Sequence, residues 1–139
     1  MKSSFRDLGE EYDRLSGKAL ADRDWEPFRA AVRDLAGSID RAKEVYDAIG
    51  LETAERFLDG RMSFEDADWV ANQLYSAMLA DGVEYGFEKY AFAKLAFKIF
   101  EAFDAGEWHR HGEDGDPAEL YTRPFLQRIL TEHLSKNGD

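Results

Sequence analysis

The chain has 139 residues, 44% of them hydrophobic, contains no cysteine and carries a formal net charge of −11 at pH 7. The length and composition favour one folded domain over residues 1–139 and argue against disorder. The lack of cysteine excludes disulfides, thiolate metal sites and a cysteine nucleophile, and it fits a cytoplasmic protein. The negative charge argues against nucleic acid binding and favours a basic partner.

The first half of the chain shows short runs of apolar residues at helical spacing, each followed by a glycine. Such runs predict amphipathic helices, and a glycine after a run predicts the helix end. The predicted helices cover 4–15, 25–36, 39–49 and 51–59, and the glycines that end them are Gly17, Gly37, Gly50 and Gly60. Asp24 is placed to cap the second helix, with Pro27 in its first turn. Residues 18–23 are predicted to form a helical turn or connector.

The richest apolar stretch covers residues 87–104 and holds five phenylalanines. Its apolar residues cover most of a helix circumference, and Gly106 follows where a C-cap glycine belongs, so we expect a largely buried central helix. The charged residues in this stretch exclude a membrane-spanning helix. A second long helix is predicted at 64–80, capped by Ser63. A turn at 81–86 would join the two helices as an antiparallel hairpin.

The last part of the chain begins with a segment, residues 105–116, in which three glycines and a charge cluster predict a loop. Asp116 is placed to cap a short turn at 117–122, and a final helix is predicted at 124–135. No segment alternates as a strand would. We therefore expect an all-α, single-domain helical bundle of about five to six helices around the central helix 87–104.

The predicted loop contains a candidate metal site. Its imidazoles and carboxylates are of the types that bind zinc or another divalent ion. These side chains are Glu107, His109, His111, Glu113, Asp114 and Asp116. Their spacing matches neither an H-E-x-x-H motif nor an EF-hand loop. The favoured interpretation is therefore a solvated acidic loop, with no metal and no cofactor.

A candidate catalytic pair lies on the predicted last helix. Arg128 and His133 match the loose Arg-x4-6-His pattern of HEPN-type ribonucleases, which are also small and all-helical, and the resemblance implies RNA cleavage by paired subunits. The match is two residues, and Ile129 lies where that family usually has a polar residue. The chain is also acidic where RNA would have to bind. The favoured interpretation is a chance match in a protein that is not an enzyme.

The excess acid is concentrated in residues 65–119, which hold 13 of the 29 acidic residues and 4 of the 18 basic ones. Aromatic side chains lie among these acids, and aromatic anchors ringed by charge are typical of protein interfaces. The carboxylates would pair with arginines of a basic partner and speed its capture. Trp108 either takes part in such an interface or folds back onto the core. The wider set of candidates also includes Asp81, Glu84 and Tyr85.

The segments AFDAGEWHR and DPAELYTRPFL, in about the last quarter of the chain, are loosely similar to small acidic bacterial immunity proteins that are encoded beside toxins. The resemblance implies a protein that neutralises a toxin, often a basic nuclease, and that needs no catalytic residue. We therefore expect an acidic protein-binding module that contacts neither nucleic acid nor membrane. Its predicted partner-binding residues lie at the 105–116 end of the hairpin: Glu65, Asp66, Asp68, Trp69, Asp104, Glu107, Trp108, Glu113, Asp114 and Asp116.

Two alternatives to the binding module stay open at this point. One is the HEPN-like helical ribonuclease, and the other is a structural or regulatory helical protein that self-associates through an aromatic patch. The binding module predicts a salt-sensitive association with a basic protein. The identity of that protein, the activity that is inhibited and the oligomeric state are left open by the sequence.

Overall fold

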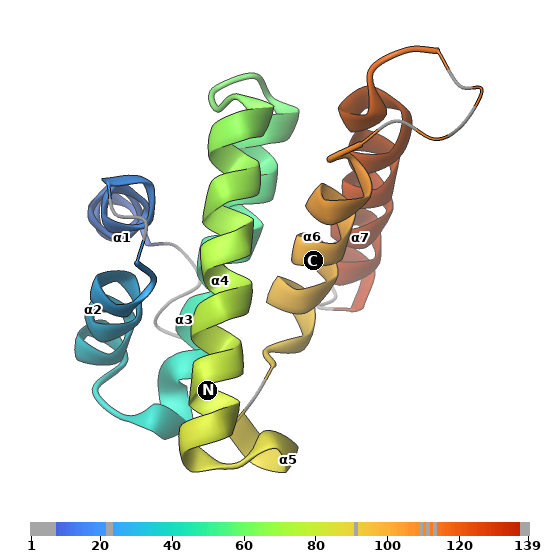
Figure 1. Ribbon diagram of the computed structural model, residues 1–139. Helices are drawn as coiled ribbons and strands as arrows, with labels where there is room; N and C mark the ends of the chain where they lie inside the picture. The colour runs from blue at the N-terminus through green and yellow to red at the C-terminus, as the bar shows by residue number, and fades with distance from the viewer. Residues whose placement is uncertain are drawn as a thin grey trace.

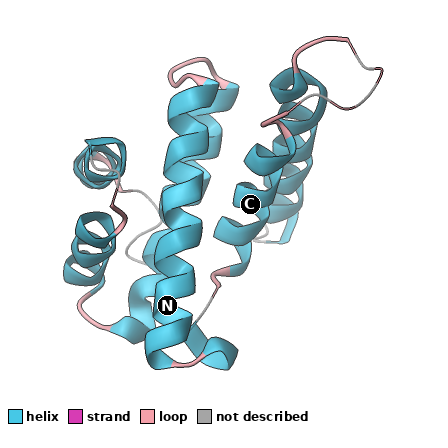
Figure 2. Cartoon of the chain, viewed as in Figure 1, coloured by secondary structure: helices cyan, strands magenta, loops and turns pink. Residues whose placement is uncertain are grey.

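The computed structural model describes residues 8–21, 24–90, 92–108, 110, 112 and 114–136. These residues form seven α-helices and one π-helical segment without a strand (Figure 1 and Figure 2), which confirms the predicted all-α bundle. The elements are α1 (Glu10–Ala21), α2 (Glu26–Ala36), α3 (Ile39–Leu58), α4 (Phe64–Tyr85), α5 (Phe87–Tyr90), α6 (Lys94–Ala105), η1 (Ala118–Thr122, the π-helical segment) and α7 (Arg123–Lys136). None of the described helices is long and apolar enough to span a membrane.

The helices α3 and α4 lie side by side in the middle of the molecule, with α1 and α2 on one side and α6 and α7 on the other (Figure 1). The core divides into two clusters of buried side chains. One cluster joins α1 and α2 to the middle pair, and Tyr12, Phe28 and Tyr46 are among its largest fully buried members. The other joins α6 and α7 to the same pair, around Phe103 and Leu126. Both clusters therefore depend on α3 and α4.

Two of the glycines that were expected to end helices lie inside helices instead. Gly17 lies within α1, which continues to Ala21, and Gly50 lies within α3, a single helix of 20 residues. The predicted division into 39–49 and 51–59 is therefore wrong. A Cβ atom at Gly50 would lie 3.3 Å from the Ala96 Cα atom, so the glycine lets α6 pack closely against α3. A close helix–helix contact of this kind cannot be predicted from the spacing of residues near Gly50 in the sequence.

The predicted caps of α2 are confirmed. Asp24 Oδ1 accepts a hydrogen bond of 3.0 Å from the Glu26 backbone N–H, although Trp25 occupies the N-cap position. Pro27 lies in the first turn, where its missing N–H costs no intrahelical hydrogen bond. Gly37 ends the helix with φ at 82°, a left-handed conformation that glycine adopts without steric penalty.

The helix α4 begins where predicted and ends later than predicted. Ser63 Oγ accepts a hydrogen bond of 3.1 Å from the Asp66 backbone N–H, which confirms the cap. The helix continues past residue 80 to Tyr85 with Gly82 buried inside it, so the predicted turn at 81–86 is reduced to Gly86. Tertiary packing here outweighs the low intrinsic helix propensity of glycine.

The predicted central helix 87–104 is divided into α5 and α6, and no residue of α5 is buried. The part that packs into the bundle, α6, begins at Lys94. Asp47 of α3 caps this start, because its Oδ1 atom accepts a hydrogen bond of 2.8 Å from the Ala96 backbone N–H. The capping carboxylate comes from 49 residues earlier in the chain, so the start of α6 is set by a tertiary contact.

The end of the chain follows the prediction closely. Asp116 Oδ1 accepts a hydrogen bond of 3.0 Å from the Ala118 backbone N–H and so caps η1. The Arg123 backbone N–H then donates to the Ala118 carbonyl, which makes the turn one residue wider than an α-helical turn. Pro124, which has no N–H to donate, lies immediately after this wide turn, at the start of α7.

Candidate functional site

The structure brings three carboxylates together where the first turns of α4 meet the end of α6. Asp68 lies on α4, Asp104 in the last turn of α6, and Glu107 just beyond it. Asn72 links the two elements, because its Nδ2 atom donates to Glu107 Oε2 at 3.1 Å and to the Asp68 carbonyl at 2.9 Å. This is the end of the hairpin at which the sequence placed the partner-binding residues. We call Asp68, Asp104 and Glu107 the acid end.

The carboxylates of the acid end repel one another. Burial, a hydrogen bond with Glu107 and the negative charges of Glu107, Asp104 and Glu65 together raise the pKa of Asp68 to about 8. Burial and the nearby Glu107 also raise the pKa of Asp104. Asp68 Oδ1 is buried, and no described group donates a hydrogen bond to it. Two ionised carboxylates cannot hydrogen-bond each other, so the Asp68–Glu107 contact is favourable only while one of them holds a proton.

The nearest described arginine along the chain is engaged elsewhere. Arg110 donates hydrogen bonds to the carbonyls of Ala105 and Trp108, and its guanidinium carbon lies 3.7 Å from the centroid of the Tyr121 ring. None of the ion pairs found among the described residues involves the acid end. The acid end is therefore a concentration of negative charge with no described counter-charge in contact.

The other predicted partner-binding residues are spread more widely. Trp69 is turned away from the acid end, because its indole Nε1 donates to the Ala19 carbonyl of α1 at 2.8 Å. Asp116 caps η1, as described above. Trp108 is 58% exposed and does not fold back onto the core. Glu65, Asp66 and Asp114 are exposed, and Glu113 lies outside the described residues.

The structure adds no support for the predicted metal site or for the predicted catalytic pair. His109, His111 and Glu113 lie outside the described residues, and the part of the chain that is described contains no group of three side chains arranged to hold a metal ion. Arg128 and His133 both lie on α7. Arg128 is exposed, with its guanidinium carbon 5.5 Å from the centroid of the Phe125 ring. The ribonuclease interpretation stays a prediction.

Three candidates of the wider acidic set serve as internal partners at the opposite end of α4. Asp81 is almost fully buried and accepts hydrogen bonds from Arg29 Nε at 2.6 Å and from the Tyr46 hydroxyl at 2.9 Å. Glu84 pairs with another nitrogen of the same Arg29 side chain. The Tyr85 hydroxyl accepts a hydrogen bond from an arginine of α2. These side chains tie α2 and α3 to α4, and their expected role in a partner-binding surface stays a prediction.

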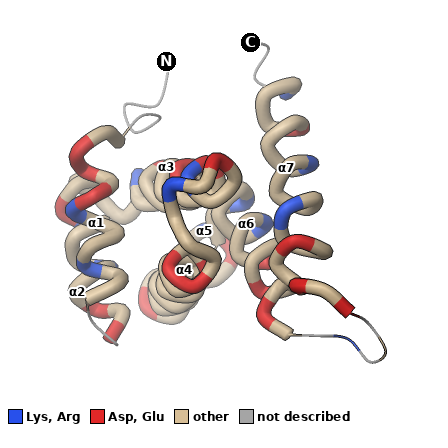
Figure 3. The backbone as a smooth tube through the Cα atoms, turned by 90° about the horizontal axis from the view of Figure 1, so that it is seen from above, with Lys and Arg blue, Asp and Glu red and all other residues tan. Residues whose placement is uncertain are grey.

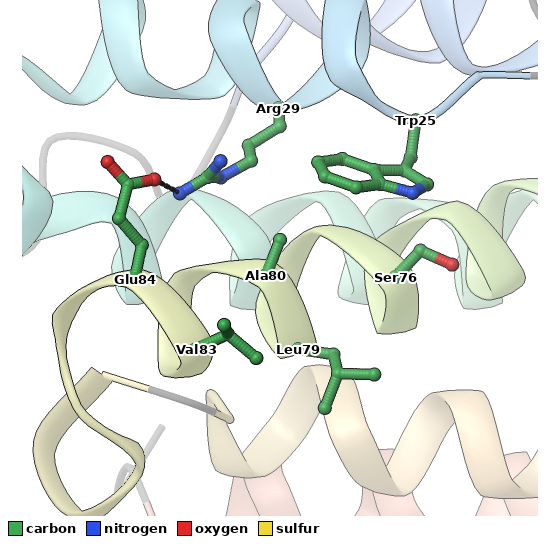
Figure 4. A pocket seen from close by; sticks show the side chains of 7 residues that line it. All are labelled: Trp25, Arg29, Ser76, Leu79, Ala80, Val83 and Glu84. Atoms are coloured by element: carbon green, nitrogen blue, oxygen red, sulfur yellow. Dashed lines mark hydrogen bonds and ion pairs between the residues drawn. The ribbon is translucent and has the colours of Figure 1, made fainter.

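A shallow groove of about 430 Å³, which the sequence did not reveal, lies between α2 and α4. Trp25, at the N-cap of α2, and Arg29 of α2 lie above it, and the remaining lining residues belong to α4 (Figure 4). Those residues are Ser76, Leu79, Ala80, Val83 and Glu84. Val83 is 71% exposed, a large value for an apolar side chain on a helix. The groove was missed because its two walls come from segments about fifty residues apart in the sequence.

A cluster of four half-buried aromatic rings lies on the other side of α4, against α6. The Tyr75 ring stacks on Phe100 and Phe92 with centroid distances of 4.5 Å and 5.7 Å. Phe97 lies 4.9 Å from Phe92 and completes the cluster. The sequence placed these phenylalanines in the core, whereas the structure leaves each of the four rings partly accessible to solvent.

No family model, no curated protein and no solved structure matches the chain. The resemblance to immunity proteins therefore stays a prediction. A functional assignment has to be argued from the acid end, the groove and the charge distribution.

Proposed function

We propose that this protein is an acidic binding module that neutralises a basic protein, as bacterial immunity proteins neutralise nuclease toxins. The proposed contact surface is the acid end together with the exposed Trp108 beside it. The observation that supports this proposal most directly is the gathering of three carboxylates at one end of α4 with no described counter-charge in contact. A protein of this kind carries out no reaction and needs no metal or cofactor.

The electrostatics of the acid end favour an incoming cation. Repulsion from neighbouring carboxylates raises the free energy of the ionised forms of Asp68 and Asp104 in the unbound protein. An arginine of the partner would contact at least two of these carboxylates, and its guanidinium offers the paired donors that carboxylates accept. Binding would thus relieve the repulsion and release the proton that Asp68 holds.

The charge distribution of the whole molecule acts in the same direction. The formal net charge is −11, and Figure 3 shows acidic residues where α4 begins and where α6 ends, whereas basic residues lie along α7. A field of this sign accelerates the approach of a basic protein and repels nucleic acid. Trp108 adds an exposed aromatic side chain next to Glu107, of the kind that anchors protein interfaces.

The proposal is tested by recovering the partner from the native host. The tagged full-length chain is used as bait at about 50 mM and about 500 mM NaCl, because screening at the higher salt weakens contacts between exposed charges. We expect a basic protein that is retained at low salt and largely lost at high salt. Co-expression should also protect cells from the toxicity of that protein. Recovery of no basic protein under either condition would contradict the proposal.

A pair of matched variants then locates the contact surface. The site variant carries Asp68→Asn, Asp104→Asn and Glu107→Gln. The control variant carries Glu10→Gln, Glu88→Gln and Glu132→Gln, which replace the same number of carboxylates at exposed positions on other helices. We expect the site variant to lose about tenfold or more in affinity and the control about threefold or less, since only the first removes direct contacts. Equal losses would mean that net charge alone, and not the acid end, determines binding.

A further inference from the structure

The solvent face of α4 changes its chemical character along the helix. Asp68, Asn72, Leu79 and Val83 recur at helical spacing, so they lie on one face. The face begins at the acid end and finishes at the groove between α2 and α4. A helix on the surface of a protein usually presents polar residues to solvent. The second half of this face is apolar instead.

The apolar half of the face is extended by side chains from both neighbouring helices. On one side, Trp25 at the N-cap of α2 forms a wall of the groove that Leu79 and Val83 also line (Figure 4). On the other side, Tyr75 and Phe97 belong to the half-buried aromatic cluster between α4 and α6. Exposed apolar side chains that gather on one face of a protein are typical of sites of protein interaction.

We propose that this face binds an amphipathic helix of the basic partner, with apolar side chains on the groove and basic side chains at the acid end. The inference rests on the proposed function and specifies the partner segment that the protein recognises. The 16 residues from Asp68 to Val83 span roughly 22 Å of helix, so a partner helix of about the same number of residues covers the face. Helices that bind in this way place anchors at spacings of three and four residues.

The negative charge of the protein favours a basic partner helix over a second copy of the same chain. Two copies would bring together surfaces of a protein that carries a net charge of −11, and the acid ends would add to their repulsion. Glu84, at the groove end, is already paired with Arg29, so the uncompensated negative charge lies at the opposite end of the face. A helix with basic residues at one end and apolar residues toward the other fits this distribution.

Two synthetic peptides of about 16 residues test the proposal with the full-length chain. The first carries arginines at one end and leucines along one side of the helix. The second has the same composition, with the leucines scrambled around the helix. A labelled form of each is titrated with the protein and followed by fluorescence anisotropy. We expect the first peptide to bind about tenfold more tightly than the second, because only its leucines reach the groove together.

Matched variants show whether the groove is responsible. The groove variant carries Leu79→Ser and Val83→Ser, and the control carries Leu134→Ser, an apolar residue on α7 that is 54% exposed. We expect the groove variant to lose about tenfold in affinity for the first peptide with an unchanged dependence on salt. The control should bind as the wild type does. Val83→Ser alone, at a position that is 71% exposed, keeps the test valid if the double variant folds poorly.

The possible results separate this inference from the proposed function. If both peptides bind equally and the groove variants have no effect, the inference is overturned, while salt-dependent binding at the acid end would still support the proposed function. If the wild type dimerises in sedimentation and the groove variant does not, the face belongs to a second copy and the inference is overturned. If binding of the first peptide is insensitive to salt and to the acid-end variant, the proposed function fails as well.

Discussion

The carboxylates at the two ends of α4 have opposite surroundings. At the C-terminal end, Asp81 is almost fully buried and lies against Arg29 and Tyr46, which donate hydrogen bonds to both of its oxygens. At the N-terminal end, Asp68 is partly buried against other carboxylates, and its Oδ1 atom has no described donor. A buried charge with partners holds a fold together, whereas one without them raises the energy of the free protein. The comparison therefore assigns the first end to stability, and it supports the proposal that the second end binds a partner.

The largest expected effect comes from removing Asp81. The Asp81→Ala variant leaves the Arg29 side chain, 11% exposed, without one of its two hydrogen-bonded carboxylates, and it leaves the buried Tyr46 hydroxyl without its acceptor. We expect a loss of about 3–5 kcal/mol in the free energy of unfolding. Urea denaturation followed by circular dichroism measures it. Asp34→Ala, at an exposed position on α2, is the control and should change stability by less than about 0.5 kcal/mol. A loss below about 1 kcal/mol for Asp81→Ala would remove the distinction between the two ends.

A smaller loss is expected at Tyr46, on the same network. The Tyr46→Phe variant keeps the buried ring and removes the hydroxyl that donates to Asp81 at 2.9 Å. A hydrogen bond to a charged group contributes about 1.5–3 kcal/mol, so the variant should unfold more easily by about 2 kcal/mol. Thermal denaturation measures the change. Combining Tyr46→Phe with Asp81→Ala should add little further loss, because the two changes remove the same contact.

The contribution of the acid end to the stability of the fold should decrease as the pH rises. The pKa of Asp68 is raised from about 3.9 in the unfolded chain to about 8 in the folded protein, so the protonated form stabilises the fold. This contribution is present at low pH and is lost as the pH rises toward 8. Because the side chain is partly exposed, solvent screening limits the expected loss to about 1.5 kcal/mol.

Asp68→Asn tests this dependence, because an amide does not titrate. Between pH 6 and pH 9 the stability of the wild type should fall relative to that of the variant. Asp47, with a pKa raised by burial to about 6, changes stability in the same direction but mainly at lower pH. Urea denaturation at several pH values measures both. Parallel curves for the wild type and Asp68→Asn would show that Asp68 does not hold a proton in the folded protein.

The smallest effect is expected at Trp69, which the sequence placed in the partner-binding surface. The Trp69→Phe variant loses the hydrogen bond to the Ala19 carbonyl and should destabilise the fold by about 0.5–1 kcal/mol. Because this side chain faces α1, the affinity for a basic partner should be unchanged. Calorimetry measures the stability, and surface plasmon resonance measures the affinity. A loss of affinity in this variant would extend the contact surface beyond the acid end toward α1.

Part of the candidate site followed from the sequence. The pairing of Asp68 with Asp104 and Glu107 was expected because a short connection between two long helices makes them antiparallel, and this brings the start of one beside the end of the other. The role of Asp81 was not expected, since its partner Arg29 lies 52 residues away. The groove was not expected either, because a hollow between α2 and α4 depends on how two helices pack.

What the sequence by itself determined about this protein is its helical class and those helix ends that depend on neighbouring residues. Ser63, Gly37 and Asp116 act on backbone groups within a few positions, so their effects can be predicted from the local pattern. Only the tertiary structure decided that Gly50 lies inside a helix and that Asp47 caps the start of α6. The physical reason is that these residues act on elements far away in the chain, and local spacing carries no information about which elements meet.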